Sequence, residues 1–215
     1  MSEDLIRAFW GNFMACHQAL VHPADTEAME GLLTALRRVD RRFYYHVGEH
    51  DQGVDLILSA EGHCDALPLL RQVRDRAPEV PGWAARAVFD GDLVIGRRNT
   101  VLFPENDDGD VLYRMACHGD DLCVERAINF SVVFSSASAR YKFLRSLEGE
   151  GLAGKPEDGG HHPWDVTVTR VMLPTHANIT AFEKRLEFLA LPFNGRNDGW
   201  GCFHRSEPAP GPGAA

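Results

Sequence analysis

The first half of the chain switches between the hydrophobic period of a helix and that of a strand. Apolar residues recur every three or four positions in residues 3–20, in a stretch beginning at Asp25 or Thr26, and in residues 65–77. That spacing predicts helices that each bury one face. Alternating or β-branched runs predict strands at residues 43–47, 54–60, 83–89 and 93–103. Turn-forming residues join the first two strands directly, so we expect an α+β sandwich with an antiparallel sheet.

The second half predicts a different order of elements. Residues 128–134 alternate between apolar and polar side chains, which is typical of a strand with one buried face. A helix capped by Ser135 or Ser136 follows, and then a glycine-rich loop over residues 153–163. The chain continues with a strand or a bent pair of strands, a helix capped by Thr175, and a last strand at about residues 199–204. This is the order of a ferredoxin-like α/β sandwich, with both helices on one face of an antiparallel sheet.

An acidic, turn-rich segment at residues 104–110 separates the two patterns. Segments of this composition are typical of linkers between domains. We therefore expect an α+β domain over residues 1–110 and a ferredoxin-like domain over residues 111–204. Residues 205–215 are rich in proline, glycine and alanine and predict a disordered tail. The chain as a whole is predicted to be a two-domain α+β protein.

Two segments of the second half carry a family resemblance. They are VTRVMLPTHANIT at residues 168–180 and NDGWGCF at residues 197–203. With the strand and helix before them, they resemble the ribonuclease E inhibitor, type B regulators (RraB-like domains). The resemblance implies a small binding protein that is not an enzyme, contacts an endoribonuclease and dampens RNA decay. The first half, with Phe9-Trp10 and Pro81-Gly82-Trp83, resembles an uncharacterised bacterial domain.

Candidate partner-binding residues lie at the predicted ends of strands, where recognition residues are frequent. His161, His162 and Trp164 belong to the glycine-rich loop, and Asp198 and Trp200 belong to a predicted glycine turn. Trp is favoured at binding hot spots. The alternative for Trp200 is packing on the sheet, and the alternative for the two histidines is a solvated loop.

The sequence contains no strong motif for metal binding or catalysis. Cys117, His118 and Cys123 have the most metal-like spacing, but a structural zinc needs a second Cys/His pair, and the sequence has none. We therefore expect no metal and no cofactor. Cys16-His17 and Cys117-His118 are sequence neighbours, which is not the spatial relation of a catalytic pair. The chain lacks the common nucleotide-binding and hydrolase motifs. A non-enzyme is predicted, and a Cys/His hydrolase is the weak alternative.

The charge of the chain limits its partners. The formal net charge is −9, which opposes binding to a phosphate backbone. The basic run at residues 37–42 suits the end of a helix and is small for a nucleic-acid patch. An RNA-binding module of ferredoxin-like fold is the other alternative, and it needs exposed aromatic side chains on the central strands. Asn129, Ser131 and Val133 are expected on the open face of the best-defined strand, which argues against it. A regulatory or adaptor protein with a protein partner, and without direct nucleic-acid binding, is favoured.

The compartment is predicted from what the first residues and the apolar runs lack. No apolar run approaches the roughly 20 residues that a membrane-spanning helix needs. The first residues carry acids and lack the basic-then-apolar order of a signal sequence. We expect a cytoplasmic protein without a membrane partner.

Overall fold

The chain divides into two compact units. The computed structural model describes residues 2–21, 23–157 and 164–205. Unit 1 spans residues 1–99 and unit 2 spans residues 100–215, and both combine helices with a sheet. The predicted α+β class with two domains is confirmed.

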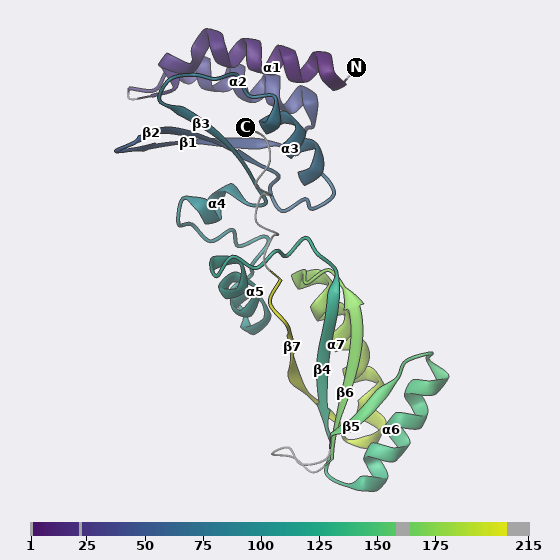
Figure 1. Ribbon diagram of the computed structural model, residues 1–215. Helices are drawn as coiled ribbons and strands as arrows, with labels where there is room; N and C mark the ends of the chain where they lie inside the picture. The colour runs from purple at the N-terminus through teal and green to yellow at the C-terminus, as the bar shows by residue number, and fades with distance from the viewer. Residues whose placement is uncertain (1, 22, 158–163, 206–215) are drawn as a thin grey trace. The chain divides into compact units, whose positions relative to one another are not determined.

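In unit 1, helices pack on a three-stranded sheet of order β1-β2-β3 (Figure 1). Its elements are α1 (Ser2–Cys16), a 3₁₀ helix (His17–Leu20), α2 (Thr26–Val39), β1 (Tyr44–His50), β2 (Gly53–Ser59), α3 (Leu67–Asp75), β3 (Trp83–Val88) and α4 (Gly91–Val94).

The sheet of unit 1 is mixed, which corrects the expectation of an antiparallel sheet. Strands β1 and β2 form the predicted antiparallel hairpin, in which His50 pairs with Gly53. Strand β3 runs parallel to β2, because α3 carries the chain back across the sheet before β3 begins. Residues 93–103 do not form the predicted strand. Residues 93 and 94 end the short helix α4, whose first turn is capped by the side chain of Asp90, and residues 95–103 are turns and irregular chain.

Aromatic side chains hold α1 against the rest of unit 1. Phe9, Trp10 and Phe13 are buried along one stripe of α1, as the helical period predicts. The Trp10 Nε1 donates a hydrogen bond of 2.9 Å to the carbonyl oxygen of Val73 in α3. The Phe13 ring meets the Trp83 ring of β3 edge-on at a centroid distance of 5.2 Å. Helices α1 and α3 therefore share one apolar layer.

Unit 2 has the predicted order of strands and helices around a four-stranded sheet, β5-β6-β4-β7, in which all neighbours are antiparallel (Figure 1). This is a split βαβ order. Its elements are α5 (Asp107–Cys117), β4 (Arg126–Val133), α6 (Ala137–Gly149), β5 (Gly154–Glu157), β6 (Asp165–Met172), α7 (His176–Ala190), a 3₁₀ helix (Leu191–Phe193) and β7 (Arg196–Cys202).

Two segments of unit 2 are more regular than predicted. The acidic segment at residues 104–110 runs into α5, since the side chain of Asn106 accepts a hydrogen bond from the backbone N–H of Gly109 and caps the helix. Acidic side chains in a first helical turn are also stabilised by the helix dipole. The predicted loop at residues 153–163 begins with β5. Strands this short are hard to recognise, because alternation needs several residues to show.

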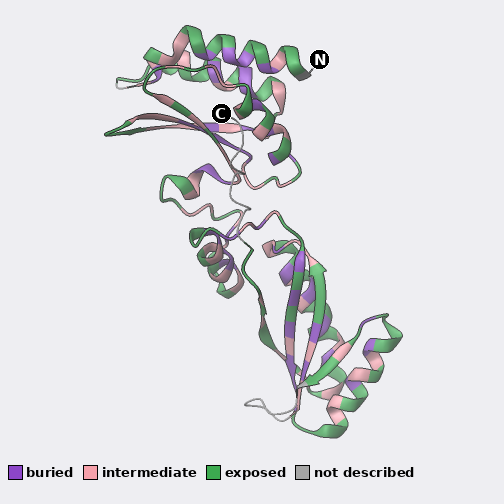
Figure 2. Ribbon diagram, viewed as in Figure 1, coloured by how far each residue is buried: buried purple, intermediate pink, exposed green. Residues whose placement is uncertain are grey.

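Strand β4 is the centre of unit 2. Ile128, Phe130 and Val132 are at most 1% exposed, whereas Asn129 between them is exposed and Ser131 is half-buried. Figure 2 shows this alternation along β4. Because successive side chains of a strand point to opposite faces, one face of the sheet is apolar and the other is polar.

Both long helices after β4 cover its apolar face. The side chains of α6 and α7 bury into one continuous core together with β4 and β6. Ser136 and Thr175 cap these helices, each accepting a backbone N–H hydrogen bond, as predicted. The buried residues that the two helices contribute are Phe143, Leu147, Ile179, Phe182, Leu186 and Ala190.

A buried ion pair fastens the start of β4 to the segment after β7. The side chains of Arg126 and Asp120 are 2% and 1% exposed and form a salt bridge. Arg126 also donates to the carbonyl oxygens of Asp121 and Phe203, and Asp120 accepts from the backbone N–H of Arg205. A buried ion pair offsets its desolvation cost only when its remaining hydrogen bonds are made, and here they are made by backbone groups.

We expect Asp120→Asn to lower the free energy of unfolding of unit 2 by about 3 kcal/mol, because it leaves the Arg126 guanidinium buried without a counter-charge. Urea unfolding, followed by hydrogen exchange of β4 peptides, measures this change. The neighbouring substitution Asp121→Asn is the control, since that side chain only accepts from the backbone N–H of Cys123, and should cost less than about 1 kcal/mol. Equal losses in both variants would contradict the role of the ion pair.

Candidate functional site

The face of the unit 2 sheet that α6 and α7 leave open carries small and polar side chains. We call it the polar sheet face. Asn129 pairs with Thr169 of β6 and with Gly201 of β7, and the Thr169 Oγ1 donates 2.8 Å to the Asn129 Oδ1. A shallow hollow of about 230 Å³ lies over the middle of this region. The polar sheet face comprises Asn129, Ser131, Thr167, Thr169, Asp198, Gly199 and Gly201.

An irregularity in β7 brings Asp198 to this face. The pairing of β4 with β7 shifts register between Phe130 and Val132, and Gly199 there has a φ of 94°, which favours glycine. The expected tight turn at Asp198-Gly199 is wrong: both residues lie inside β7, at a β-bulge. A bulge re-aims the side chains beside it, and Asp198 is exposed at the hollow.

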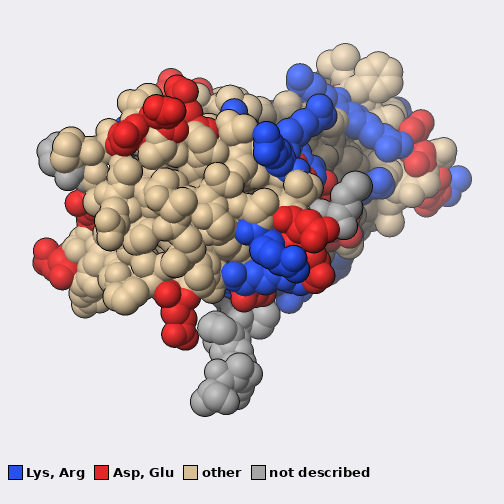
Figure 3. Space-filling view, turned by 90° about the horizontal axis from the view of Figure 1, so that it is seen from above, with Lys and Arg blue, Asp and Glu red and all other residues tan. Residues whose placement is uncertain are grey.

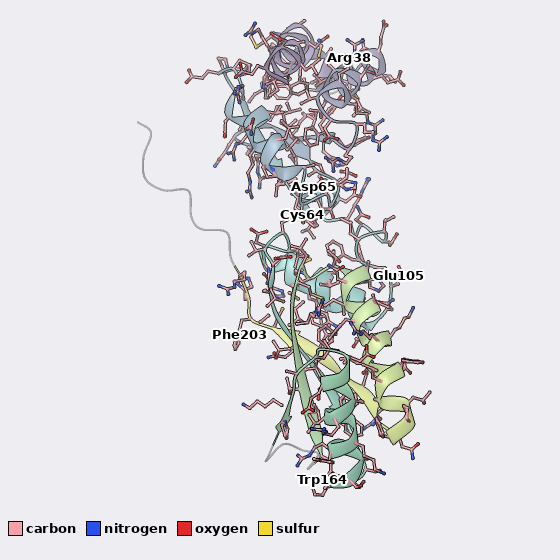
Figure 4. The ribbon with its side chains drawn as sticks, turned by 90° about the vertical axis from the view of Figure 1, so that its right-hand side faces the viewer. Arg38, Cys64, Asp65, Glu105, Trp164 and Phe203 are labelled. Carbon is pink, nitrogen blue, oxygen red and sulfur yellow. The ribbon has the colours of Figure 1, made fainter. Side chains whose placement is uncertain are left out.

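The predicted partner-binding residues that the structure describes do not gather in one place. His161 and His162 lie outside the described residues. Trp164 packs against the core, and the Arg140 guanidinium of α6 lies 5.3 Å from its ring centroid; Figure 4 shows it at the end of the unit beside α6. Trp200 also packs against the core. Of the described candidates, only Asp198 is an exposed side chain on the polar sheet face.

Trp200 takes part in an acidic cluster that the sequence did not indicate. Its Nε1 donates 2.8 Å to the Asp108 Oδ1 of α5. Thr180 of α7 donates to the other oxygen of the same carboxyl group at 3.4 Å. Burial raises the pKa of Glu183 to about 7, and the charge of Asp108 and a hydrogen bond with it add to this effect. No sequence signal joins residues so far apart in the chain; only the docking of α5 does.

The possible reactive groups do not assemble into a catalytic or metal centre within the described part of the chain. Cys117 is an exposed free thiol, and the His118 Nδ1 is 2.6 Å from the carbonyl oxygen of Arg114. Burial raises the pKa of the Cys16 and Cys202 thiols, which is opposite to the shift that activates a nucleophile. No group of three or more His, Cys, Asp or Glu side chains that could hold a metal occurs among the described residues.

The basic run of α2 is partly neutralised by acids. Arg42 bonds to Asp40 at 2.7 Å and to Asp65 at 2.6 Å, and these hydrogen bonds lower the pKa of both carboxyl groups. Figure 3 shows acidic side chains beside basic ones on the face it presents. The side chains that make up the polar sheet face include no aromatic ring, so this face lacks the stacking platforms of an RNA-binding surface.

The helices of the described chain include none that is long and apolar enough to cross a membrane.

Unit 2 is thus an α+β sandwich domain of the split βαβ class with one polar, exposed sheet face. Residues 105–202 match the family model RraB, described as Regulator of ribonuclease activity B. The matched range begins just before α5 and ends on the last residue of β7. This match confirms the resemblance predicted for the C-terminal half of the chain. Searches of curated proteins and of solved structures each gave no match.

We expect the acidic cluster to make the docking of α5 depend on pH. Glu183 has a folded pKa of about 7, above its ordinary value of 4.5, so the stability that it contributes in its protonated form is lost as the pH rises from about 4.5 through 7. Glu183→Gln should remove this dependence, since an amide can donate to Asp108 at any pH. Hydrogen exchange of α5 peptides at pH 5.5 and 8, corrected for intrinsic rates, measures it.

The control is Glu187→Gln, one turn further along α7, where the side chain is exposed and adds only a small charge effect. It should keep the pH dependence of α5 exchange. If the wild type and Glu183→Gln exchange alike at both pH values, the cluster does not control the docking of α5.

Proposed function

We propose that the chain is a regulatory protein that binds an endoribonuclease through unit 2 and lowers its activity by occupying its surface. The observation that carries the proposal is the match of residues 105–202 to the Regulator of ribonuclease activity B family. The partner-binding role of the polar sheet face is part of the proposal. The mechanism needs no chemistry from the chain, in keeping with a non-enzyme.

The dimensions of the sheet support a docking surface that extends beyond its polar face. The strands have four, eight, eight and seven residues. At a spacing of roughly 4.8 Å between strands and roughly 3.4 Å per residue, they cover on the order of 450 Å². A stable protein interface buries about 800 Å² on each partner. The face supplies about half of that area, so neighbouring segments must contribute.

The remaining area would come from the end of the unit where β5 and β6 meet. These strands pair from Glu157 and Asp165 inward, so their first pairs lie at the margin of the polar sheet face. Trp164 lies at the same end. In this arrangement Asp198 contacts the partner directly. Trp200 does not contact the partner and instead packs against the core beneath the polar sheet face. A carboxylate on the face suits a basic patch on the partner.

The test is inhibition of RNA cleavage by a purified endoribonuclease of the host of this protein, with the full chain added at increasing concentration. Gly201→Arg places a large side chain on the polar sheet face without strain, since a Cβ at Gly201 would meet nothing within 4 Å. It should weaken inhibition and binding at least about tenfold, because a side chain that cannot be accommodated at an interface costs about 1.4 kcal/mol or more.

The matched control is Gly149→Arg at the end of α6, where an added Cβ also meets nothing within 4 Å. It introduces the same side chain away from the polar sheet face and should inhibit like the wild type. A wild-type chain that neither binds the nuclease nor slows cleavage would refute the proposed function. Equal inhibition by the two variants would mean that the nuclease does not dock on the polar sheet face.

A further inference from the structure

Unit 2 has a groove on the helix-covered side of its sheet, away from the polar sheet face. The groove has a volume of about 380 Å³. One wall is the second half of β6, and the other is a stripe of α7 with helical spacing. Its lining residues are Glu125, Arg170, Val171, Met172, Leu173, Asn178, Ala181, Phe182 and Arg185.

The strand that forms one wall has an unpaired edge. On its outer side β6 pairs with β5 only over residues 165–168. Residues 169–172 pair with β4 on the inner side, and no described strand pairs with them on the outer side. Every other backbone N–H and C=O of such a segment points outward, ready to pair with another chain.

The opposite wall fits an extended backbone in length. From Asn178 to Arg185 the helix rises about 10 Å at roughly 1.5 Å per residue. An extended chain covers that distance with three or four residues at roughly 3.3 Å each. The unpaired part of β6 has the same length. Phe182, which is 6% exposed, gives the floor of the groove an apolar surface for a side chain.

The charges of the groove oppose those of the whole chain. The lining carries two arginines, Arg170 and Arg185, against one acid, Glu125, while the chain has a net charge of −9. The Arg170 guanidinium lies 5.7 Å from the centroid of the Phe182 ring. Arg185 bonds to Glu150 at 2.9 Å, and both side chains remain partly exposed. Since Arg185 shares its charge with Glu150, Arg170 is the arginine that mainly favours an acidic occupant.

We propose that this groove binds a short, extended, acidic segment of a protein partner, which adds as a strand to the free edge of β6 while its carboxylates meet the two arginines. Strand addition supplies affinity through main-chain hydrogen bonds, and pockets beside the edge supply specificity. The proposal rests on the proposed function only in requiring a protein partner. It holds for a nuclease and for any other protein with such a segment.

The probe is a fluorescein-labelled eight-residue peptide in which valine alternates with aspartate, added to the full chain and followed by fluorescence anisotropy. Arg170→Glu and Ala181→Glu should each weaken binding by about fivefold. This corresponds to a cost of about 1 kcal/mol for a reversed or added charge at a partly exposed site. Lys184→Glu is the matched control on the exposed side of α7 and should change binding less than about twofold.

Two further probes test the backbone pairing and the charge without altering the protein. A peptide N-methylated at alternate amides loses the donors of one edge, and it should bind at least about tenfold more weakly if it adds as a strand. A peptide in which lysine replaces aspartate should not bind. Because the protein is unchanged in these arms, they remain decisive even if a variant misfolds, which circular dichroism would reveal.

Equal binding of the methylated and unmethylated peptides would overturn the strand-addition proposal. So would tighter binding of a labelled single-stranded RNA, or self-association of the chain that Arg170→Glu abolishes, since either would assign the groove another occupant. Nuclease inhibition without peptide binding would remove this inference alone. Peptide binding without any nuclease inhibition would remove the proposed function alone.

Discussion

Strand β4 sets the geometry on which the rest of unit 2 depends. It pairs with β6 on one side and β7 on the other. Its side chains alternate between a buried and an open face up to Val132, and Val133 at its end is also buried. A slip of one residue would turn Phe130 outward and Asn129 into the core. That cost fixes the register of both neighbours and therefore decides which face α6 and α7 cover. The polar sheet face is the necessary counterpart of that core.

Helix α5 shows how a polar contact extends this arrangement beyond the sheet. Its Asp108 accepts from the indole of Trp200 on β7 and from Thr180 on α7, so one carboxyl group joins a helix to both the sheet and its covering layer. The family match begins close to the start of this helix, and α5 lies within unit 2. The raised pKa of the neighbouring Glu183 is the reason to expect that this contact depends on pH.

The two surfaces discussed for unit 2 follow from different constraints. The polar sheet face exists because two helices can cover only one side of four strands. The groove exists because β5 is shorter than β6, which leaves part of an inner strand without a neighbour. A flat polar face and an unpaired edge favour different contacts: the first uses side chains over a wide area, and the second uses the backbone over a few residues.

The sequence by itself determined the features that depend on near neighbours in the chain. Period-two alternation located β4. The cap at Ser135 or Ser136 and the cap at Thr175 located the starts of two helices. The segments at residues 168–180 and 197–203 indicated the family model that residues 105–202 match. The sequence predicted a strand at residues 93–103 wrongly, since a short apolar run has no period that separates strand from helix. The acidic composition of residues 104–110 likewise predicted a linker, although this segment runs into the helix α5 that Asn106 caps.

Only the tertiary structure decided the features that depend on distant partners. Each of these features requires knowledge of what lies beside a strand: the parallel direction of β3, the bulge that exposes Asp198, the hydrogen bond of Trp200 to Asp108 and the free edge of β6. Local propensity cannot supply this, since the same alternating segment can pair in either direction and at either edge. The residues that could contact a partner were therefore harder to predict than the fold that presents them.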